Sequence, residues 1–330
     1  MKAAIVGIAG AELRPEEARL FAAHPPAGII LFARNIADPM QLRALMAALR
    51  RVLPRDAVLM VDQEGGRVAR LRPPYWRAHP PVAVIGDLFA VDPGAGLRAA
   101  WLSGALIGLD CRAAGFDVVC APVLDVRAPG AHDVIGDRAF AADANRVARL
   151  GWAMGQGLLA AGIQPVMKHA PGHGRARVDS HLELPVVTEA DLTADFAPFA
   201  RNVALPWAMS AHILYTSLDP SRPATFSPAV IGGIVRGRMG FRGVMVSDDL
   251  AMQALSGTQG ERAVAALAGG CDLALYCAGE LSANAELLAA SPELGGAAAA
   301  RFGAARAMAQ ARLLVLDPVA LAAERDRLLA

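Results

Sequence analysis

Residues 168–181 (KHAPGHGRARVDSH) combine the residue types that acid/base chemistry uses. One proline and two glycines oppose a helix, so we predict a loop that leaves a strand, with the glycines as hinges of a lid. Asp179 and His181 are two residues apart, so their side chains share a face if the chain is extended. The carboxylate can then orient and charge-stabilise the imidazole, as a histidine general acid/base requires near neutral pH. The alternative is a mobile loop whose histidines have no chemical role.

Acids also follow two apolar runs elsewhere in the chain. The run VMVS precedes Asp248 and Asp249, and Asp248 can act as a carboxylate nucleophile towards an anomeric carbon, while Asp249 points the other way if the strand continues. Asp62 opens the sequence DQEGGRVAR, whose glycine pair lets the backbone turn sharply under a ligand. Asp62 can accept hydrogen bonds from sugar hydroxyls. Arg70, which follows the turn, can point back into the same pocket. The simpler alternatives are a helix N-cap at Asp248 and a surface ion pair at Asp62.

Two cations are further candidates. Lys2 and Lys168 are the only lysines among 32 basic residues, a bias that a GC-rich genome explains. An internal lysine that survives such a bias suggests a need for a compact ammonium donor on a flexible stem. Arg138, in the sequence VIGDRAF, is a candidate substrate contact, and loop packing is its alternative.

These side chains need a scaffold, and the apolar pattern predicts one. Eight short apolar or β-branched runs cover residues 3–8, 28–32, 58–62, 117–122, 164–169, 207–212, 243–249 and 272–277. Helix-compatible stretches cover residues 16–24, 40–52, 94–115, 144–161, 189–202, 228–239, 259–269 and 297–314. Eight alternations predict a parallel α/β sheet, and the number favours a closed (β/α)8 TIM barrel over an open sheet. No linker divides the chain, so we expect residues 1–330 to form a single domain.

Helix-start signals and the barrel itself add two expectations. Asp38-Pro39, the sequence TEAD at 188–191 and Ser227-Pro228 each predict a helix start. In a (β/α)8 barrel, chemistry gathers where strands end. Asp62, Lys168, His169, His212 and Asp248 all lie at such ends.

Composition excludes several classes of protein. The chain has 55% hydrophobic and 19% charged residues, which excludes wholesale disorder, and its longest uncharged stretch is too short to span a membrane. A net charge of +1 argues against a nucleic-acid or membrane partner. Four scattered cysteines form neither a disulfide scaffold nor a zinc motif. We therefore expect a cytoplasmic protein.

Taken together, the motifs resemble glycoside hydrolase family 3, and within it the bacterial single-domain β-N-acetylglucosaminidases of cell-wall recycling. The matching pieces, in order, are 28–35 (GIILFARN), 61–67 (VDQEGGR), 121–126 (APVLDV), 135–138 (IGDR), 168–169 with 171–174 (KH, PGHG), 179–181 (DSH), 211–212 (AH) and 247–250 (SDDL). Ala170 and Arg175 depart from the pattern, which suggests a different lid or leaving-group subsite.

The resemblance implies a retaining β-N-acetylhexosaminidase. In that reading Asp248 attacks C1 of a terminal N-acetylglucosamine, and His181, paired with Asp179, protonates the leaving oxygen and later activates water. The residues implied to hold the sugar are Asp62, Arg70, Arg138, Lys168 and His169. The implied substrate is N-acetylglucosaminyl-1,6-anhydro-N-acetylmuramic acid, with or without its peptide. We expect no cofactor or metal and a monomer.

Three alternatives stay open. A metal-dependent barrel hydrolase would use His169, His173, His212 and Asp248 as ligands, although the first strand lacks the HxH pair common in such barrels. A phosphorolytic variant of the same family and a non-catalytic glycan sensor are the others.

Overall fold

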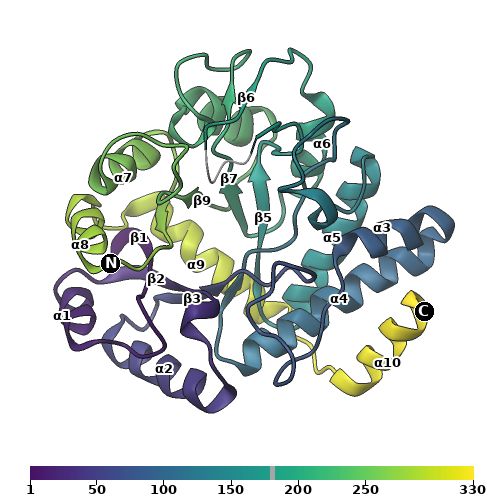
Figure 1. Ribbon diagram of the computed structural model, residues 1–330, viewed down its shortest axis with the longest axis horizontal. Helices are drawn as coiled ribbons and strands as arrows, with labels where there is room; N and C mark the ends of the chain where they lie inside the picture. The colour runs from purple at the N-terminus through teal and green to yellow at the C-terminus, as the bar shows by residue number, and fades with distance from the viewer. Residues whose placement is uncertain (179–182) are drawn as a thin grey trace.

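Eight parallel strands close into a barrel in the computed structural model, which describes residues 1–178 and 183–330 (Figure 1). Around the barrel the order is β1-β2-β3-β4-β5-β7-β9-β10, and the last strand pairs with the first. The strands are β1 (Lys2–Gly7), β2 (Pro26–Leu31), β3 (Val58–Val61), β4 (Val118–Val119), β5 (Gln164–Ala170), β7 (Trp207–Ser210), β9 (Val244–Asp249) and β10 (Leu273–Tyr276). Each overlaps a predicted strand, so the predicted (β/α)8 barrel is confirmed.

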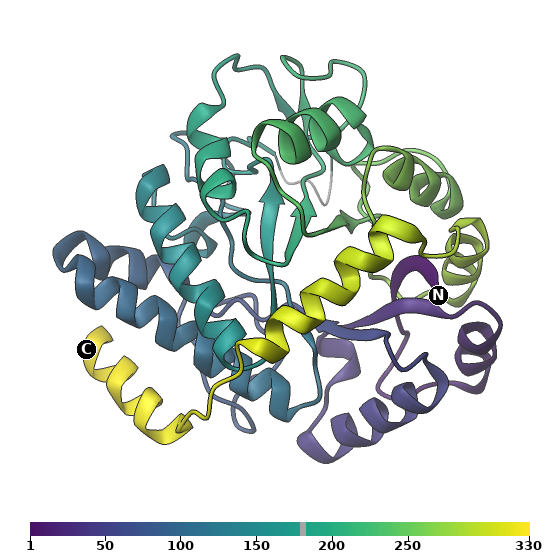
Figure 2. The same cartoon turned by 180° about the vertical axis from the view of Figure 1, so that it is seen from behind.

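Helices surround the strands (Figures 1 and 2). They are α1 (Pro15–Ala23), α2 (Pro39–Val52), α3 (Val82–Val91), α4 (Pro93–Ala113), α5 (Ala144–Ala160), α6 (Thr193–Arg201), the wide helix η4 (Ala229–Arg238), α7 (Gln259–Ala268), α8 (Leu281–Ala290), α9 (Gly296–Ala311) and α10 (Pro318–Leu329). Helices α3, α8 and α10 lie outside the predicted stretches. In the described part of the chain, no helix is long and apolar enough to cross a membrane.

Alternate strand residues face the barrel interior and the helices. In β1, Ile5 belongs to the interior cluster and its neighbour Val6 packs towards the helices. Trp207, at the start of β7, is fully buried, and its indole Nε1 donates to Gln164 Oε1 at 2.9 Å. Its ring meets Phe302 of α9 edge to face, with centroids 5.5 Å apart, and Figure 2 shows α9 crossing this end of the barrel. Helix α9 therefore closes the amino ends of the strands and leaves the carboxyl ends for a site.

The last helix, α10, is attached to α4 by polar contacts. Arg98 makes a bidentate pair with Glu324, both contacts being 2.7 Å. Arg325 is buried and donates to His79 Nδ1 at 3.2 Å, so His79 carries its proton on Nε2, which donates to Asp110 Oδ2 at 3.0 Å. Through the contact between Arg325 and His79, helix α10 thus packs against the segment that follows β3.

Helix starts test the capping predictions. Asp38 caps α2 as predicted, since its Oδ1 accepts from two backbone N–H groups at 2.8 and 2.9 Å. Ser227 Oγ accepts from Val230 N at 3.2 Å, and η4 begins directly after Pro228.

The capping box predicted at residue 188 is wrong. Helix α6 begins only at Thr193. The two residues before Thr188 form a short strand, β6 (Val186–Val187), which pairs with β8 (Leu214–Tyr215), so the chain is still extended where the helix start is predicted. Thr188 N instead donates to Glu189 Oε2 at 3.1 Å.

Candidate active site

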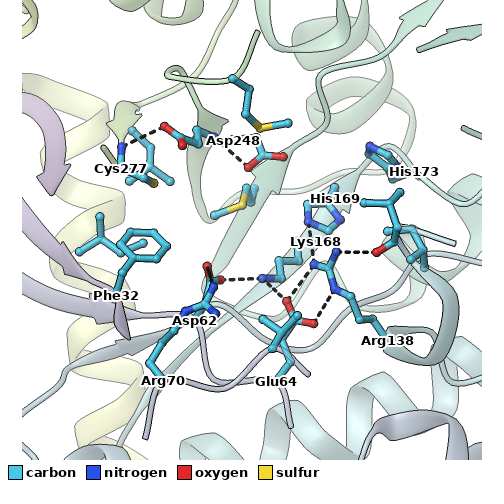
Figure 3. A pocket seen from close by; sticks show the side chains of 18 residues that line it. Phe32, Asp62, Glu64, Arg70, Arg138, Lys168, His169, His173, Asp248 and Cys277 are labelled. Carbon is cyan, nitrogen blue, oxygen red and sulfur yellow. Dashed lines mark hydrogen bonds and ion pairs between the residues drawn. The ribbon is translucent and has the colours of Figure 1, made fainter. Parts of the chain in front are cut away.

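A cavity of about 170 Å³ opens at the carboxyl ends of the strands (Figure 3). Ile30 of β2, Phe32 and Met209 of β7 provide apolar walls. Further apolar residues line it as well, and charged and imidazole side chains come from β5, β9 and the loops after β3, β4 and β5. The site thus lies where a barrel concentrates its chemistry.

Five charged side chains on one side of this cavity are joined by ion pairs. Lys168 Nζ lies 2.8 Å from Asp62 Oδ1 and 2.5 Å from Glu64 Oε1. Arg138 makes a bidentate pair with Glu64, in which Nε donates to Oε2 at 2.8 Å and Nη2 donates to Oε1 at 2.9 Å. Arg70 Nη2 is 3.4 Å from Asp62 Oδ2. With three cations and two carboxylates, the cluster keeps N–H donors available for uncharged ligand oxygens.

The cluster stays charged at neutral pH. Burial alone would raise the pKa of Asp62, but the charges of Lys168 and Arg70 outweigh it and hold this pKa well below its usual range. For Glu64, Lys168 and Arg138 likewise outweigh burial and lower the pKa of the carboxyl. Burial would lower the pKa of Lys168, but Asp62 and Glu64 raise it above its ordinary value. Lys168 is therefore a permanent donor, not a base.

Gln63 explains why the chain after β3 returns to the cavity. It is fully buried, and its Oε1 accepts from Arg70 N at 2.7 Å and Leu71 N at 3.0 Å. Its Nε2 donates to Leu71 O at 2.9 Å. One amide thus ties both ends of the turn together, which brings the Arg70 guanidinium back to Asp62.

The two glycines of this turn are required by its geometry. Gly65 has φ +102°, and a Cβ there would lie 2.4 Å from the carbonyl oxygen of Pro80. Gly66 has φ +55°, and its N–H donates to the carbonyl of His79 at 2.8 Å. Residues 79–80 therefore support the turn that carries Glu64.

Asp125 organises the two imidazoles that lie next to the ion cluster. It is fully buried, its Oδ2 lies 2.7 Å from His169 Nδ1, and its Oδ1 accepts from the backbone N–H groups of His169 and His173 at 3.1 and 2.7 Å. His169 Nε2 is directed towards Arg138, 3.5 Å from Nη2. Burial would raise the pKa of Asp125, but these contacts lower it to about 2. Burial, with the charge of His169, lowers the pKa of His173 to about 4.

Asp248 lies at the carboxyl end of β9, opposite the ion cluster (Figure 3). Its Oδ1 accepts from the N–H of Asp249 at 2.8 Å, and its own N–H donates to Ser210 Oγ at 3.3 Å. Asp249, which strand alternation predicts to point the other way, also lines the cavity, and its Oδ1 accepts from Ala251 N and Cys277 N, both at 2.9 Å. Among the described residues, the second oxygen of Asp248 has no hydrogen-bond donor, which suits attack on a ligand.

The charge state of Asp248 suits a nucleophile. Burial would raise its pKa, but the charges of His169 and His212 and the N–H of Asp249 together lower it below the ordinary value. Asp248 is therefore a carboxylate at neutral pH, whereas burial raises the pKa of Asp249.

The described start of the loop after β5 is packed closely. A Cβ on Gly174 would lie 1.8 Å from the carbonyl oxygen of Val126, and Ala128 N donates to Gly174 O at 3.2 Å. Arg175 Nε lies 2.7 Å from Asp195 Oδ2. The departure at Arg175 thus adds an ion pair between this loop and α6.

The structure brings six of the eight predicted site residues to one cavity, namely Asp62, Arg70, Arg138, Lys168, His169 and Asp248. Asp179 and His181 lie outside the described residues. Glu64 and Asp125 are central to the geometry but absent from the prediction. Glu64 is two residues after Asp62, and this spacing, which can place two side chains on one face, was a usable signal.

Residues 3–306 match the family model "Glycosyl hydrolase family 3 N terminal domain". The chain belongs to glycosyl hydrolase family 3. Beta-hexosaminidases of Xylella fastidiosa and Bordetella pertussis are 42% and 40% identical to it over 284 and 285 residues; the aligned parts cover 84% of this chain in both cases, and 84% and 80% of the relatives. The structure of NagZ from Neisseria gonorrhoeae in complex with N-trifluoroacetyl-D-glucosamine matches with a TM-score of 0.88 and 32% identity, covering 100% of this chain and 98% of that one.

This family 3 chain is a glycoside hydrolase, and the predicted resemblance is confirmed. The four side chains of the metal-dependent alternative do not form one ligand set. His169 Nδ1 contacts Asp125, and both ring nitrogens of His212 are engaged, by Thr225 and the carbonyl of Asp249. Within residues 1–178 and 183–330, no group of three or more His, Cys, Asp or Glu side chains is placed to hold a metal ion.

Proposed function

We propose that this glycoside hydrolase is a retaining β-N-acetylhexosaminidase that removes terminal β-linked N-acetylglucosamine. The preferred substrate would be N-acetylglucosaminyl-1,6-anhydro-N-acetylmuramic acid, with or without its peptide, in cytoplasmic peptidoglycan recycling. The observation that carries the proposal is the position of the Asp248 carboxylate, which faces the Asp62–Lys168–Arg138–His169 side of one small cavity. The two beta-hexosaminidase relatives and the solved NagZ complex with an N-acylated glucosamine support the sugar class.

In the proposed first step, Asp248 attacks C1 of the sugar. The C1–Oδ bond forms as the glycosidic C1–O bond breaks, and the leaving oxygen takes the proton of His181. The Asp249 N–H holds one carboxylate oxygen at 2.8 Å, which leaves the other for C1. Because the pKa of Asp248 is lowered, the nucleophile needs no base.

In the second step, water attacks C1 of the glycosyl-aspartate. His181, now neutral, takes the water proton, and Asp248 leaves as a carboxylate, so two inversions give net retention. Asp179 would orient His181 in both steps. The pair replaces the carboxylic acid that most retaining glycosidases use.

The ion cluster would bind the sugar. Asp62 and Glu64 keep Lys168 charged and fixed, and the ammonium offers donors to ring hydroxyls. Arg138 and His169 lie side by side and would contact the hydroxyls and the N-acetyl group. Phe32 and Met209 would pack against the apolar face of the ring.

The experiment is a trapping measurement. A slow 5-fluoro N-acetylglucosaminyl substrate is incubated with the enzyme, and peptides are analysed by mass spectrometry. The expected result is a glycosyl adduct on the peptide containing Asp248, and none in Asp248→Ala. An adduct on another residue, or turnover with inverted product and no adduct, would contradict the proposal.

Parallel reactions separate the alternatives. Release of 4-nitrophenol from its N-acetyl-β-glucosaminide excludes a sensor. A sugar phosphate formed only with added phosphate would indicate phosphorolysis, and loss of activity with a chelator would indicate a metal.

A further inference from the structure

Three buried polar residues lie behind Asp248 and take no part in the proposed sugar binding. Ser210, His212 and Thr225 are fully buried. Thr225 Oγ1 lies 2.8 Å from Ser210 Oγ and 2.8 Å from His212 Nδ1. We call these three residues the Ser210–His212–Thr225 network.

The network contacts the backbone on both sides of the Asp248–Asp249 peptide. Ser210 Oγ accepts from Asp248 N at 3.3 Å. His212 Nε2 lies 3.0 Å from the carbonyl oxygen of Asp249. A carbonyl oxygen only accepts, so His212 carries a proton on Nε2 and donates it there.

These two contacts hold the peptide units that flank the one donating to the carboxylate. The Asp248 N–H belongs to the preceding peptide unit, and the Asp249 carbonyl belongs to the following one. With both held, the plane of the unit between them is fixed, and its N–H is the group that donates to Asp248 Oδ1 at 2.8 Å. The network therefore acts on the direction of the carboxylate without touching a ligand.

Stability alone does not require polar residues here. Apolar side chains of similar volume can fill a buried site at least as well as a polar network. The hydroxyls and the imidazole bond one another, the carbonyl of Ala211 at 3.0 Å, and the backbone of residues 248 and 249. The contacts to residues 248 and 249 are the ones that link the network to the nucleophile.

We propose that Thr225 and His212, acting through Ser210 and the Asp249 carbonyl, are positioning residues that aim the Asp248 carboxylate at C1. This inference rests on the proposed function of Asp248. A small misplacement of a reacting group costs up to about a hundredfold in rate, so the effect belongs in kcat and in the trapping rate, with KM little changed.

The experiment compares Thr225→Val, which removes only the hydroxyl, with Thr225→Ser, which keeps it. We expect Thr225→Val to lower kcat for 4-nitrophenyl N-acetyl-β-glucosaminide and the rate of Asp248 labelling by about tenfold or more, with KM within about threefold. Thr225→Ser, which keeps the hydroxyl, should leave both rates close to those of the wild type. Ser210→Ala tests the same link from the other side, and decides the question if Thr225→Val fails to fold.

The matched control is Ser227→Ala. Ser227 is a buried hydroxyl two residues from Thr225 that bonds Asp219 Oδ2 at 2.7 Å and lies outside the network. We expect Ser227→Ala to lower the midpoint of thermal unfolding but to leave kcat unchanged. If Thr225→Val and Ser210→Ala keep kcat within twofold of the wild type, or if Ser227→Ala lowers kcat equally, the inference is wrong. A wild-type enzyme that neither turns over nor is labelled contradicts the proposed function instead.

Discussion

Glu64→Gln tests whether the ion cluster is a buried network in which each charge depends on its partners. The change keeps the shape of the side chain and removes only its charge. Glu64 is 4% exposed and is held between Lys168 (3%) and Arg138 (11%). Removing one partner from such a pair costs about 3–5 kcal/mol, because the remaining charge is left buried and unpaired. Lys168 keeps Asp62 as a partner, so we expect the lower end, about 3 kcal/mol.

The assay is urea unfolding at pH 7, followed through the fluorescence of the four tryptophans. The urea midpoint should fall at unchanged slope. The control is Glu293→Gln: Glu293 is 66% exposed and lies 2.7 Å from the N-terminal amine, and such exposed pairs contribute about 0–1 kcal/mol.

The pH dependence has a definite sign. The pKa of Glu64 is lower in the folded protein than its ordinary value of 4.5, so its contribution is complete above that value and is lost as the pH falls through the folded pKa. The difference between wild type and Glu64→Gln should therefore shrink below about pH 4.5. Equal small losses in both Gln variants, or a difference that grows in acid, would refute the reasoning.

Three further predictions concern the rest of the site. Gly174→Ala should lose about 1–3 kcal/mol of stability or more in urea unfolding, because its Cβ would meet the carbonyl of Val126, whereas Gly232→Ala, with open space around it, should not. Burial lowers the pKa of His173 to about 4 from 6.5, so the unfolded chain binds a proton first and urea stability should fall between pH 6.5 and 4, less steeply in His173→Asn. Lys168→Arg should lower kcat/KM for the 4-nitrophenyl substrate at least about tenfold, since a planar fork cannot replace an ammonium held between two carboxylates; near-normal activity would contradict this.

Much of the barrel could be predicted because its strands have a clear apolar pattern and clear boundaries. Helix α3 is absent from the prediction because its sequence, VAVIGDLFAV, is apolar and rich in β-branched residues, a pattern that fits either a strand or a helix. The start of α6 was misplaced because Val187 pairs with Tyr215, a tertiary contact that local capping rules do not contain.

The site was predictable where strand ends carried charge, as at Asp62, Lys168 and Asp248. Partners within a charge cluster were harder to find. Glu64 follows Asp62 by two residues, but its two cations come from distant parts of the chain, Lys168 from β5 and Arg138 from the segment after β4. Asp125 meets His169 across 44 residues of sequence. A single sequence does not reveal such long-range pairs.

Helix α10 lies beyond the residues that the family model matches, yet Arg325 donates to His79, whose carbonyl accepts from Gly66 in the turn that carries Glu64. A homologue with a different last helix must cover His79 in another way, because its Nδ1 would otherwise lose its donor. Positions 79 and 325 are therefore expected to co-vary across family members, and their pairing would distinguish chains that use a C-terminal helix as scaffold from chains that do not.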